Sequence, residues 1–333
     1  FMSNKRLKIA LVTGGYTKES VINYKSAINV KKHFDKEKFD VYQINIEPNG
    51  WYYNDDDTTT KSTMIDRNDF SLTINEKKIK FDCVFMRIAG SPGEDGKLQG
   101  YFDMINMPYS GCSRSTSSAL TLNKRLAVAV AGFYGINVPK SVCVEKPIDN
   151  RSTILQQLEL PVFVKPNNSG SSLGANRVET IDELQFALDH AFDEDHQVIV
   201  QEAIDGREFT IAVYKLKGKI DTFPITEIIP HNKYYDYAAK YCGQSTEISP
   251  AKIHNILENE IRRSATKIYE VMECSCIASV DFIYNEKNEK LYFLEVNTMP
   301  GLTDANPLPQ QVKAMGLTLT ELYTAFIEDA LGL

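Results

Sequence analysis

The sequence lacks the features that define several large classes of protein. Of its 333 residues only six are cysteines, and their scattered positions match no zinc-binding or redox spacing. No apolar run approaches the roughly 20 residues that span a bilayer, and no secretory leader is visible. These absences predict reduced thiols and a cytoplasmic location, without insertion into a membrane.

Positive charge is also scarce. The chain has 37 Lys and Arg residues against 44 Asp and Glu residues, which gives a formal net charge of -7. This balance argues against nucleic acid or an anionic membrane surface as the main partner. Two glycine-rich nucleotide-binding patterns, GxxxxGK[ST] and GxGxxG, are absent as well.

The first third of the chain predicts an α/β fold. Strand-like segments occupy residues 8–15, 41–46 and 81–90, and a helical segment passes through Ala27 and Val30. This alternation is typical of an open parallel sheet, in which ligands bind beyond the carboxyl ends of the strands. A chain of this length has room for two or three such domains.

Further elements follow along the chain. We expect a helix at 117–134, a strand at 161–166, two strands in 198–214 joined at Asp205–Gly206, and helices that begin at the capping boxes Thr180–Glu183 and Thr318–Glu321.

A carboxylate and an amide interrupt the last predicted strand, LYFLEVN. Side chains alternate along a strand, so Glu295 and Asn297 share one face. The upstream strand IASVDFIY carries Asp281, and a polar turn at 285–290 separates the two strands. A hairpin centred near Asn288 would place Asp281 opposite Glu295 and residue 279 opposite Asn297. Oxygen ligands of this kind suit Mg²⁺; the alternative is a solvated hairpin face with ordinary surface acids.

The segment VKPNNSGSSLG, residues 164–174, has the composition of a phosphate-binding loop. Its glycines let the backbone approach a ligand closely, and its serines supply hydroxyl and N–H groups. Lys165 could place an ammonium group on a phosphate. The alternative is a flexible polar loop on the surface.

Three other segments carry weaker signals. In GGYTKES, residues 14–20, Glu19 could accept a hydrogen bond from a substrate ammonium, although a Glu at the start of a helix is common. GEDGKLQG, residues 93–100, is a glycine-punctuated loop without specificity of its own. YYDYAAKY, residues 234–241, suits a lid over a site; the alternative is a loop without a role.

In this order, and together with GREFT at 206–210 and LEVNTMPG at 294–301, these segments resemble the D-alanine–D-alanine ligases of the ATP-grasp superfamily. The resemblance covers nearly the whole chain. It implies an N-terminal α/β substrate domain (1–112), a central ATP-grasp lobe (113–204) and a C-terminal lobe with the lid and metal site (205–333). It also implies ATP and amino acids as substrates, two Mg²⁺ ions that Mn²⁺ can replace, and a homodimer.

The resemblance implies roles for individual residues at the nucleotide. Lys124 and Lys165 match the lysines that grip the ATP phosphates, Gln201, Glu202 and Ile204 match the hinge that binds adenine, and Glu208 matches the ribose ligand. Asp281, Glu295 and Asn297 match the Mg²⁺ ligands.

It also implies roles at the amino acids. Glu19, Ser171 and Tyr241 match a hydrogen-bonded trio that closes the lid, Lys240 matches the lid lysine that reaches the transferred phosphate, and the N–H of Gly301 matches an oxyanion donor. The implied activity is that of an ATP-dependent carboxylate–amine ligase, acting through an acyl phosphate in D-alanyl-D-alanine synthesis for peptidoglycan.

Three positions depart from the family pattern. Ala89, Ser279 and Asn306 stand where the family has His, Arg and Ser, all around the amino-acid subsites. Two alternatives therefore stay open: a ligase for another amino acid or amine, and a nucleotide-binding paralogue without ligase activity. We expect Arg87 to compensate in part, because it lies two residues from Ala89 and faces the same way along the strand.

Overall fold

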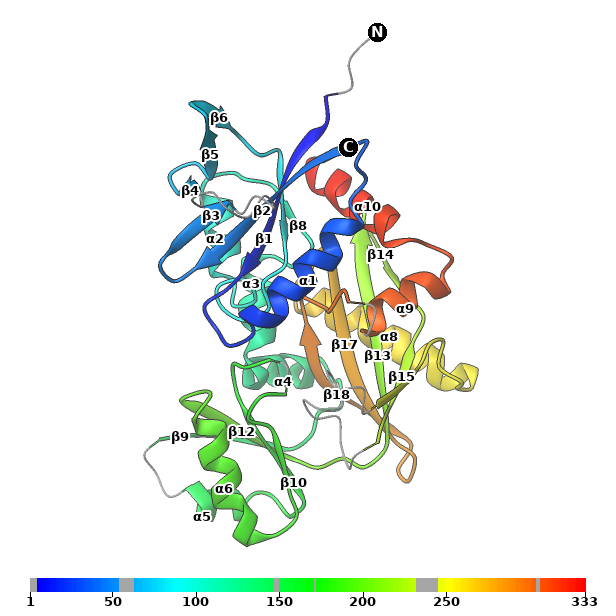
Figure 1. Cartoon of the computed structure of the whole chain (residues 1–333). Coiled ribbons are helices and arrows are strands. Elements are labelled where there is room, and N and C mark those ends of the chain that lie inside the picture. The colour runs from blue at the N-terminus through cyan, green and yellow to red at the C-terminus, as the bar shows by residue number, and fades with distance from the viewer. Residues whose placement is uncertain (1–4, 54–62, 147–149, 171, 232–244, 304–305) are drawn as a thin grey trace.

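The computed structural model describes residues 5–53, 63–146, 150–170, 172–231, 245–303 and 306–333. Three β-sheets, each with its own helices, form the N-terminal, central and C-terminal parts of the molecule (Figure 1). The domain boundaries expected after residues 112 and 204 stay predictions. No helix in these ranges is both long and apolar enough to cross a membrane.

The N-terminal sheet has the strand order β6-β5-β4-β3-β2-β1-β7-β8. Its parallel half consists of β1 (Leu7–Gly14), β2 (Phe39–Glu47), β7 (Cys83–Met86) and β8 (Tyr109–Ser110). This half confirms the predicted open parallel sheet. An antiparallel meander of β3 (Gly50–Tyr53), β4 (Thr63–Asp66), β5 (Ser71–Ile74) and β6 (Lys77–Ile79) extends it, which the sequence did not lead us to expect.

Four helices belong to the first part of the chain: α1 (Ser20–Lys32), α2 (Lys97–Met104), α3 (Ser115–Leu122) and α4 (Lys124–Phe133). The single helix predicted at 117–134 is wrong in one respect, because Asn123 divides it. Its backbone is extended, and its side chain accepts a hydrogen bond from the Leu126 N–H and so caps α4. The segment 93–100, expected to be a loop, is only partly one, because its last four residues form the first turn of α2.

The central sheet is antiparallel, with the order β11-β10-β12-β9. Its elements are β9 (Ser141–Glu145), α5 (Asn150–Leu155), β10 (Val162–Pro166), β11 (Asn176–Val178), α6 (Ile181–Phe192) and β12 (Gln197–Glu202). The predicted capping box at the start of α6 is present. Val162 and Val164 of β10 are buried in the core that includes α6, so the alternate side chains Phe163 and Lys165 face the opposite side of the sheet.

The C-terminal sheet has the order β16-β15-β13-β17-β18, with β14 paired to β13. Its elements are β13 (Arg207–Leu216), β14 (Lys219–Thr222), β15 (Thr226–Pro230), β16 (Ser245–Ile248), α8 (Asn255–Val271), β17 (Ile277–Asn285), β18 (Lys290–Asn297), α9 (Pro307–Ala314) and α10 (Leu319–Leu331). The predicted capping box at Thr318 opens α10. That helix packs on the N-terminal sheet, where the rings of Tyr323 and Phe85 lie 5.0 Å apart, so the first and last parts of the chain share one core.

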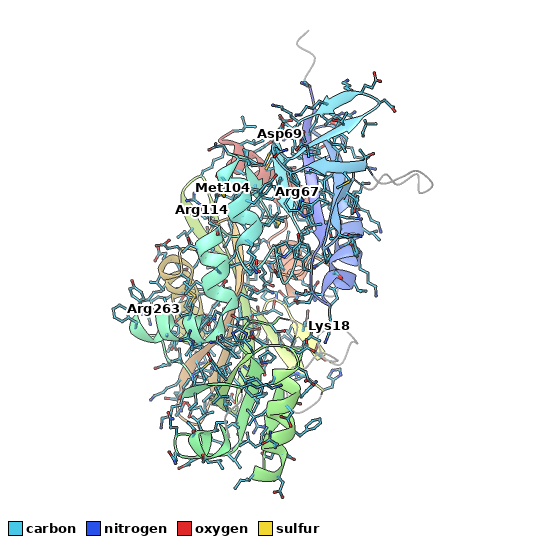
Figure 2. The ribbon with its side chains drawn as sticks, turned by 90° about the vertical axis from the view of Figure 1, so that its left-hand side faces the viewer. Lys18, Arg67, Asp69, Met104, Arg114 and Arg263 are labelled. Atoms are coloured by element: carbon cyan, nitrogen blue, oxygen red, sulfur yellow. The ribbon has the colours of Figure 1, made fainter. Side chains whose placement is uncertain are left out.

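The N-terminal part also contacts the central lobe. Lys18, in the loop after β1, lies beside the lobe (Figure 2), and its Nζ is 2.6 Å from a carboxylate oxygen of Glu194. The Lys18 side chain is 73% exposed, so this ion pair contributes little stability. The five described cysteines are free thiols, as predicted, and Cys242 lies outside the described residues.

Candidate active site

The β17–β18 hairpin forms one wall of the site. As predicted, Asp281 lies opposite Glu295 and Ser279 lies opposite Asn297. The ladder is irregular beside Asp281, because the next pair is Phe282 with Phe293 and one residue of β18, Leu294, is left over. Such a β-bulge turns two consecutive side chains toward one side, here Leu294 and Glu295, which line the same cavity.

Lys124, the first residue of α4, joins this hairpin to the glycine-rich loop. Its Nζ lies 3.7 Å from Oε2 of Glu295 and donates a hydrogen bond to the Ser169 carbonyl at 2.5 Å. The Lys124 backbone N–H donates to the carbonyl of Asn167, and that residue's side chain accepts from the next N–H of α4. The start of α4 and the loop therefore form one unit around a cation that is only 14% exposed.

Lys165 lies on the adjacent wall, on β10. Its Nζ donates to Oε1 of Gln201 at 3.3 Å and lies 5.3 Å from the centre of the Phe163 ring. The Gln201 amide in turn donates to the hydroxyl of Ser141. These contacts hold the ammonium group of Lys165 on the inner face of the central sheet.

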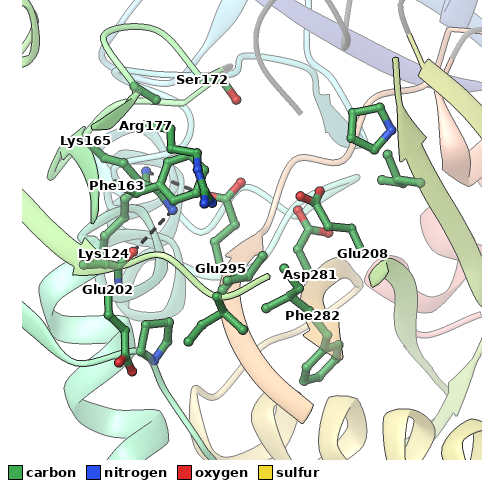
Figure 3. A pocket seen from close by; sticks show the side chains of 18 of the residues that line it. Lys124, Phe163, Lys165, Ser172, Arg177, Glu202, Glu208, Asp281, Phe282 and Glu295 are labelled. Carbon is green, nitrogen blue, oxygen red and sulfur yellow. Dashed lines mark hydrogen bonds and ion pairs between the residues drawn. The ribbon is translucent and has the colours of Figure 1, made fainter. Parts of the chain in front are cut away.

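A cavity of about 230 Å³ lies between the central and C-terminal sheets. Figure 3 shows Lys124 and Lys165 on one side of it and the carboxylates of Glu208, Asp281 and Glu295 pointing into it. Eight residues that the sequence singled out line this cavity: Lys124, Lys165, Gln201, Glu202, Ile204, Glu208, Asp281 and Glu295. The Glu202 carboxylate accepts a hydrogen bond from the Lys140 N–H at 2.9 Å, at an exposed position.

A second cavity, of about 450 Å³, adjoins the first. It is lined by Glu19, Asn297 and Gly301, the remaining described residues of the predicted site. The two cavities share a wall formed by Lys124, Ser169, Gly170, Ile228, Asp281 and Glu295. The three positions that depart from the family pattern, Ala89, Ser279 and Asn306, all line the larger cavity and none lines the smaller one.

Glu19 is wedged between two glycines from different parts of the chain. It is 5% exposed. A Cβ atom added to Gly90 would lie 2.5 Å from one oxygen of its carboxylate, and a Cβ added to Gly170 would lie 2.8 Å from the other. Both distances are shorter than any van der Waals contact, so this carboxylate reaches its place only because neither neighbour has a side chain.

A second buried acid, Glu94, lies in the same cavity and was not predicted. Its Oε2 accepts from the Gly90 N–H at 2.9 Å. Burial, and secondly the nearby charge of Glu19, raise the pKa of Glu94 to about 7. A carboxyl group that changes protonation near neutral pH therefore lies beside the predicted ammonium-binding acid.

Other residues of the smaller cavity were missed as well. Phe163, Arg177 and Leu294 line it. The alternation of β10 could have identified Phe163, because it lies two residues from Lys165. No sequence signal marks Arg177 or the bulged Leu294. Ser171, Lys240 and Tyr241 lie outside the described residues, so their roles stay predictions.

The donor set of the hairpin fits a magnesium ion. Asp281 and Glu295 supply two carboxylates, and Asn297 adds an amide oxygen, which also accepts from the Met299 N–H at 2.7 Å. The described residues contain no group of three or more His, Cys, Asp or Glu side chains that could hold a metal by themselves. Mg²⁺ commonly takes only one or two carboxylates and leaves its other positions to water and phosphate oxygens.

Comparisons with known proteins agree with this geometry. The family models described as D-ala D-ala ligase N-terminus and C-terminus match residues 8–112 and 122–328. The D-alanine–D-alanine ligase of Flavobacterium johnsoniae is 42% identical over 97% of this chain and 99% of its own length. The D-Ala:D-Ser ligase VanG of Enterococcus faecalis superimposes with a TM-score of 0.82 at 30% identity, covering 99% of both chains. The D-alanine–D-alanine ligase of Coxiella burnetii superimposes with a TM-score of 0.86 at 28% identity, covering 98% of this chain and 94% of its own.

Proposed function

The chain belongs to the D-alanine–D-alanine ligase family, and on that premise we propose that it joins two D-alanine molecules for peptidoglycan synthesis. Members of this family have the ATP-grasp fold and are ATP-dependent, ADP-forming ligases. One observation carries the proposal: a cavity sized for part of a nucleotide and a cavity that contains buried acids share a wall of one lysine and two carboxylates. We also propose a cytoplasmic homodimer.

In the first step, an oxygen of the first D-alanine carboxylate attacks the γ-phosphorus of ATP. The bond to the β-phosphate oxygen breaks, ADP takes the electron pair, and an acyl phosphate forms. Such a transfer depends on positioning and on neutralising the phosphoryl oxygens. Lys124 and Lys165 are the cations that we assign to this task, while Glu208 would bind the ribose and the backbone at Ile204 the adenine.

The hairpin would hold the metal. Asp281, Glu295 and Asn297 are the proposed ligands of Mg²⁺, which when bound supplies further positive charge to the phosphate oxygens. We take Mn²⁺ to be able to replace it, and two ions to be present. The ammonium of Lys124 next to Glu295 keeps positive charge on the shared wall.

In the second step, the amine of the second D-alanine attacks the carbonyl carbon of the acyl phosphate. An oxyanion forms, the C–O bond to phosphate then breaks with its electron pair, and the amine loses a proton to solvent. The N–H of Gly301 would donate to the oxyanion, and Glu19 would bind the ammonium of the first D-alanine. Donors preorganised in this way supply much of the rate enhancement in acyl transfer.

A different acceptor is the second candidate. Ala89, Ser279 and Asn306 line the larger cavity, while the smaller cavity is lined by the described residues that the resemblance assigns to ATP: Lys124, Lys165, Gln201, Glu202, Ile204 and Glu208. This asymmetry favours an unaltered ATP-activating part combined with a changed acceptor pocket. D-serine is one such acceptor for the similar VanG protein. A nucleotide-binding paralogue without ligase activity is the third candidate.

An assay of phosphate release, with ATP and Mg²⁺ present, distinguishes these three candidates. Release with D-alanine alone supports D-alanyl-D-alanine synthesis, whereas release that requires D-alanine together with another amino acid or amine supports the second candidate. ATP-dependent thermal stabilisation without release on a broad panel of D-amino acids and amines supports the third. Analysis of the products by mass spectrometry identifies the bond formed.

A further inference from the structure

Arg87 is a buried cation next to the proposed oxyanion donor. It follows β7, is 5% exposed and lines the larger cavity. Its Nη2 donates a hydrogen bond to the carbonyl oxygen of Pro300 at 2.8 Å, and its Nε has no hydrogen-bond partner among the residues that the structure describes. Burial lowers the pKa of this guanidinium, yet an Arg keeps its charge inside proteins. This nearly buried charge is therefore hydrogen-bonded to the Pro300–Gly301 peptide group.

That peptide group is the one that contains the Gly301 N–H. The Pro300 carbonyl and the Gly301 N–H belong to one planar unit, which is not among the cis peptide bonds of the described chain. In a trans peptide the two groups point in opposite directions, so a contact that fixes the oxygen also fixes the N–H. Hydrogen bonding by a charged donor polarises the unit and strengthens the N–H as a donor.

The Gly301 N–H has no acceptor within the described residues. The other side of the turn is held by Asn306, whose Oδ1 accepts from the N–H of Thr303 at 3.0 Å and from its hydroxyl at 2.6 Å. The Asn306 carboxamide lies so close that a Cβ added to Gly301 would be 2.4 Å from its Cγ. Arg87 and Asn306 therefore hold the turn from opposite sides, and the Gly301 N–H remains available to a ligand.

We propose that Arg87 is a positioning residue that holds the Gly301 N–H as a preorganised donor to the oxyanion. This inference rests on the proposed function. It explains how the larger cavity stabilises negative charge although Ser279 supplies no guanidinium. Arg87 acts through the Pro300–Gly301 peptide and not by touching the substrate.

Steady-state kinetics test the proposal with Arg87→Gln, Arg87→Lys and a matched control. Loss of one preorganised oxyanion donor lowers kcat about 10²- to 10³-fold, so we expect a fall of this order for Arg87→Gln, with an unchanged KM for ATP. Arg87→Lys retains a charged donor and should recover kcat to within roughly tenfold of wild type. Lys32→Gln removes an exposed cation of α1 that lines neither cavity and should leave kcat unchanged. A raised KM for the amino acid at unchanged kcat would instead indicate direct contact and overturn the proposal.

A spectroscopic test does not depend on turnover. The sequence contains two Pro–Gly pairs, Pro92–Gly93 and Pro300–Gly301. Protein labelled with carbonyl-¹³C proline and ¹⁵N glycine therefore gives two selected amide signals, one for each pair. Arg87→Gln should shift the Gly301 signal and accelerate its hydrogen exchange, while Gly93, whose N–H donates to the Gly90 carbonyl at 3.0 Å, serves as the internal reference.

The two tests separate failure of the inference from failure of the proposed function. An unchanged Gly301 signal in Arg87→Gln, with ATP-dependent thermal stabilisation intact, overturns the inference even in an active ligase. A shifted Gly301 signal in a protein whose wild type releases no phosphate with D-alanine supports the inference and refutes D-alanyl-D-alanine synthesis.

Discussion

Glu295 lies directly opposite Asp281 in the β17–β18 hairpin, although the pairing at the turn would bring Leu294 to that place. The ladder begins with Asn285 opposite Lys290, and the bulge beside Asp281 then takes up one residue of β18. Two consecutive side chains of one strand consequently line the smaller cavity. One of them is apolar, as a nucleotide base requires, and the other is an acid, as a metal requires.

Glu295→Gln should weaken the binding of Mg²⁺ and so raise the Mg²⁺ concentration that activity requires. The change removes one of the two carboxylates and leaves a neutral oxygen in its place. We expect the Mg²⁺ concentration at half-maximal phosphate release to rise at least about tenfold, since weaker perturbations around metal ligands already cost 10- to 100-fold. Titration of Mg²⁺ at saturating ATP measures this, and a chelator should abolish phosphate release by the wild-type protein.

The matched control is Glu289→Gln, which makes the same chemical change at an exposed position in the turn of the same hairpin. It should keep the wild-type response to Mg²⁺. A wild-type titration curve for Glu295→Gln would show that the hairpin carboxylates do not hold the metal.

Leu294→Ala should weaken nucleotide binding and leave the chemical step intact. The side chain is half-buried and lines the smaller cavity. Full burial of a leucine is worth about 1.5–3 kcal/mol, so loss of a partial contact predicts a rise in the KM for ATP of roughly tenfold at unchanged kcat. Leu294→Met conserves the volume and should change the KM little. An equal fall in kcat would mean that the bulge, and not the apolar contact, had been altered.

The hairpin and the capped helices could be predicted because their rules are local. Alternation along the strands and the polar turn at 285–290 fixed which side chains share a face, and the structure confirms the pairing of Asp281 with Glu295. The capping boxes at Thr180 and Thr318 satisfy backbone donors within one turn of helix, and both are present.

Features that depend on contacts between distant segments could not be predicted. The apolar pattern continues across Asn123, and only the capped geometry shows that α3 ends there. The residues next to Glu94 in the sequence do not indicate a perturbed acid. Its raised pKa follows from burial and from the charge of Glu19, which lies 75 positions earlier in the chain. Arg87 was expected to face the same way as Ala89 along one strand. Its hydrogen bond to the Pro300 carbonyl could not be predicted, because 213 positions separate the two residues.

Gly170→Ala should impair binding of the first amino acid more than binding of ATP. The new Cβ would lie 2.8 Å from a carboxylate oxygen of Glu19, so one of the two must move. We expect the KM for D-alanine to rise severalfold, on the order of 1 kcal/mol, while the KM for ATP stays within about twofold of wild type. Gly132→Ala in α4 is the control, because its added methyl meets its nearest neighbour at 3.5 Å and a helix prefers alanine. Unchanged kinetics for Gly170→Ala would argue against a substrate-binding role for Glu19.

Glu94 should make stability depend on pH in the neutral range. Its pKa is about 7 in the folded protein, against an ordinary value of 4.5, so between these values the folded state binds more protons than the unfolded state. Stability must then fall as pH rises through this window. The contribution is fully present below about pH 4.5 and is lost above pH 7, because the folded protein must then hold a charged carboxylate in a buried place beside Glu19.

Glu94→Gln removes this dependence, since Gln cannot ionise but still offers an oxygen to the Gly90 N–H. Between pH 5 and pH 8 we expect the wild type to lose about 2–3 kcal/mol of stability relative to the variant. Thermal midpoints of both proteins across this range measure the effect. The Tm of the variant should rise relative to the Tm of the wild type as pH rises. A constant difference in Tm would show that folding does not shift the pKa of Glu94, so that its carboxyl group is charged across this range in the folded and the unfolded protein alike.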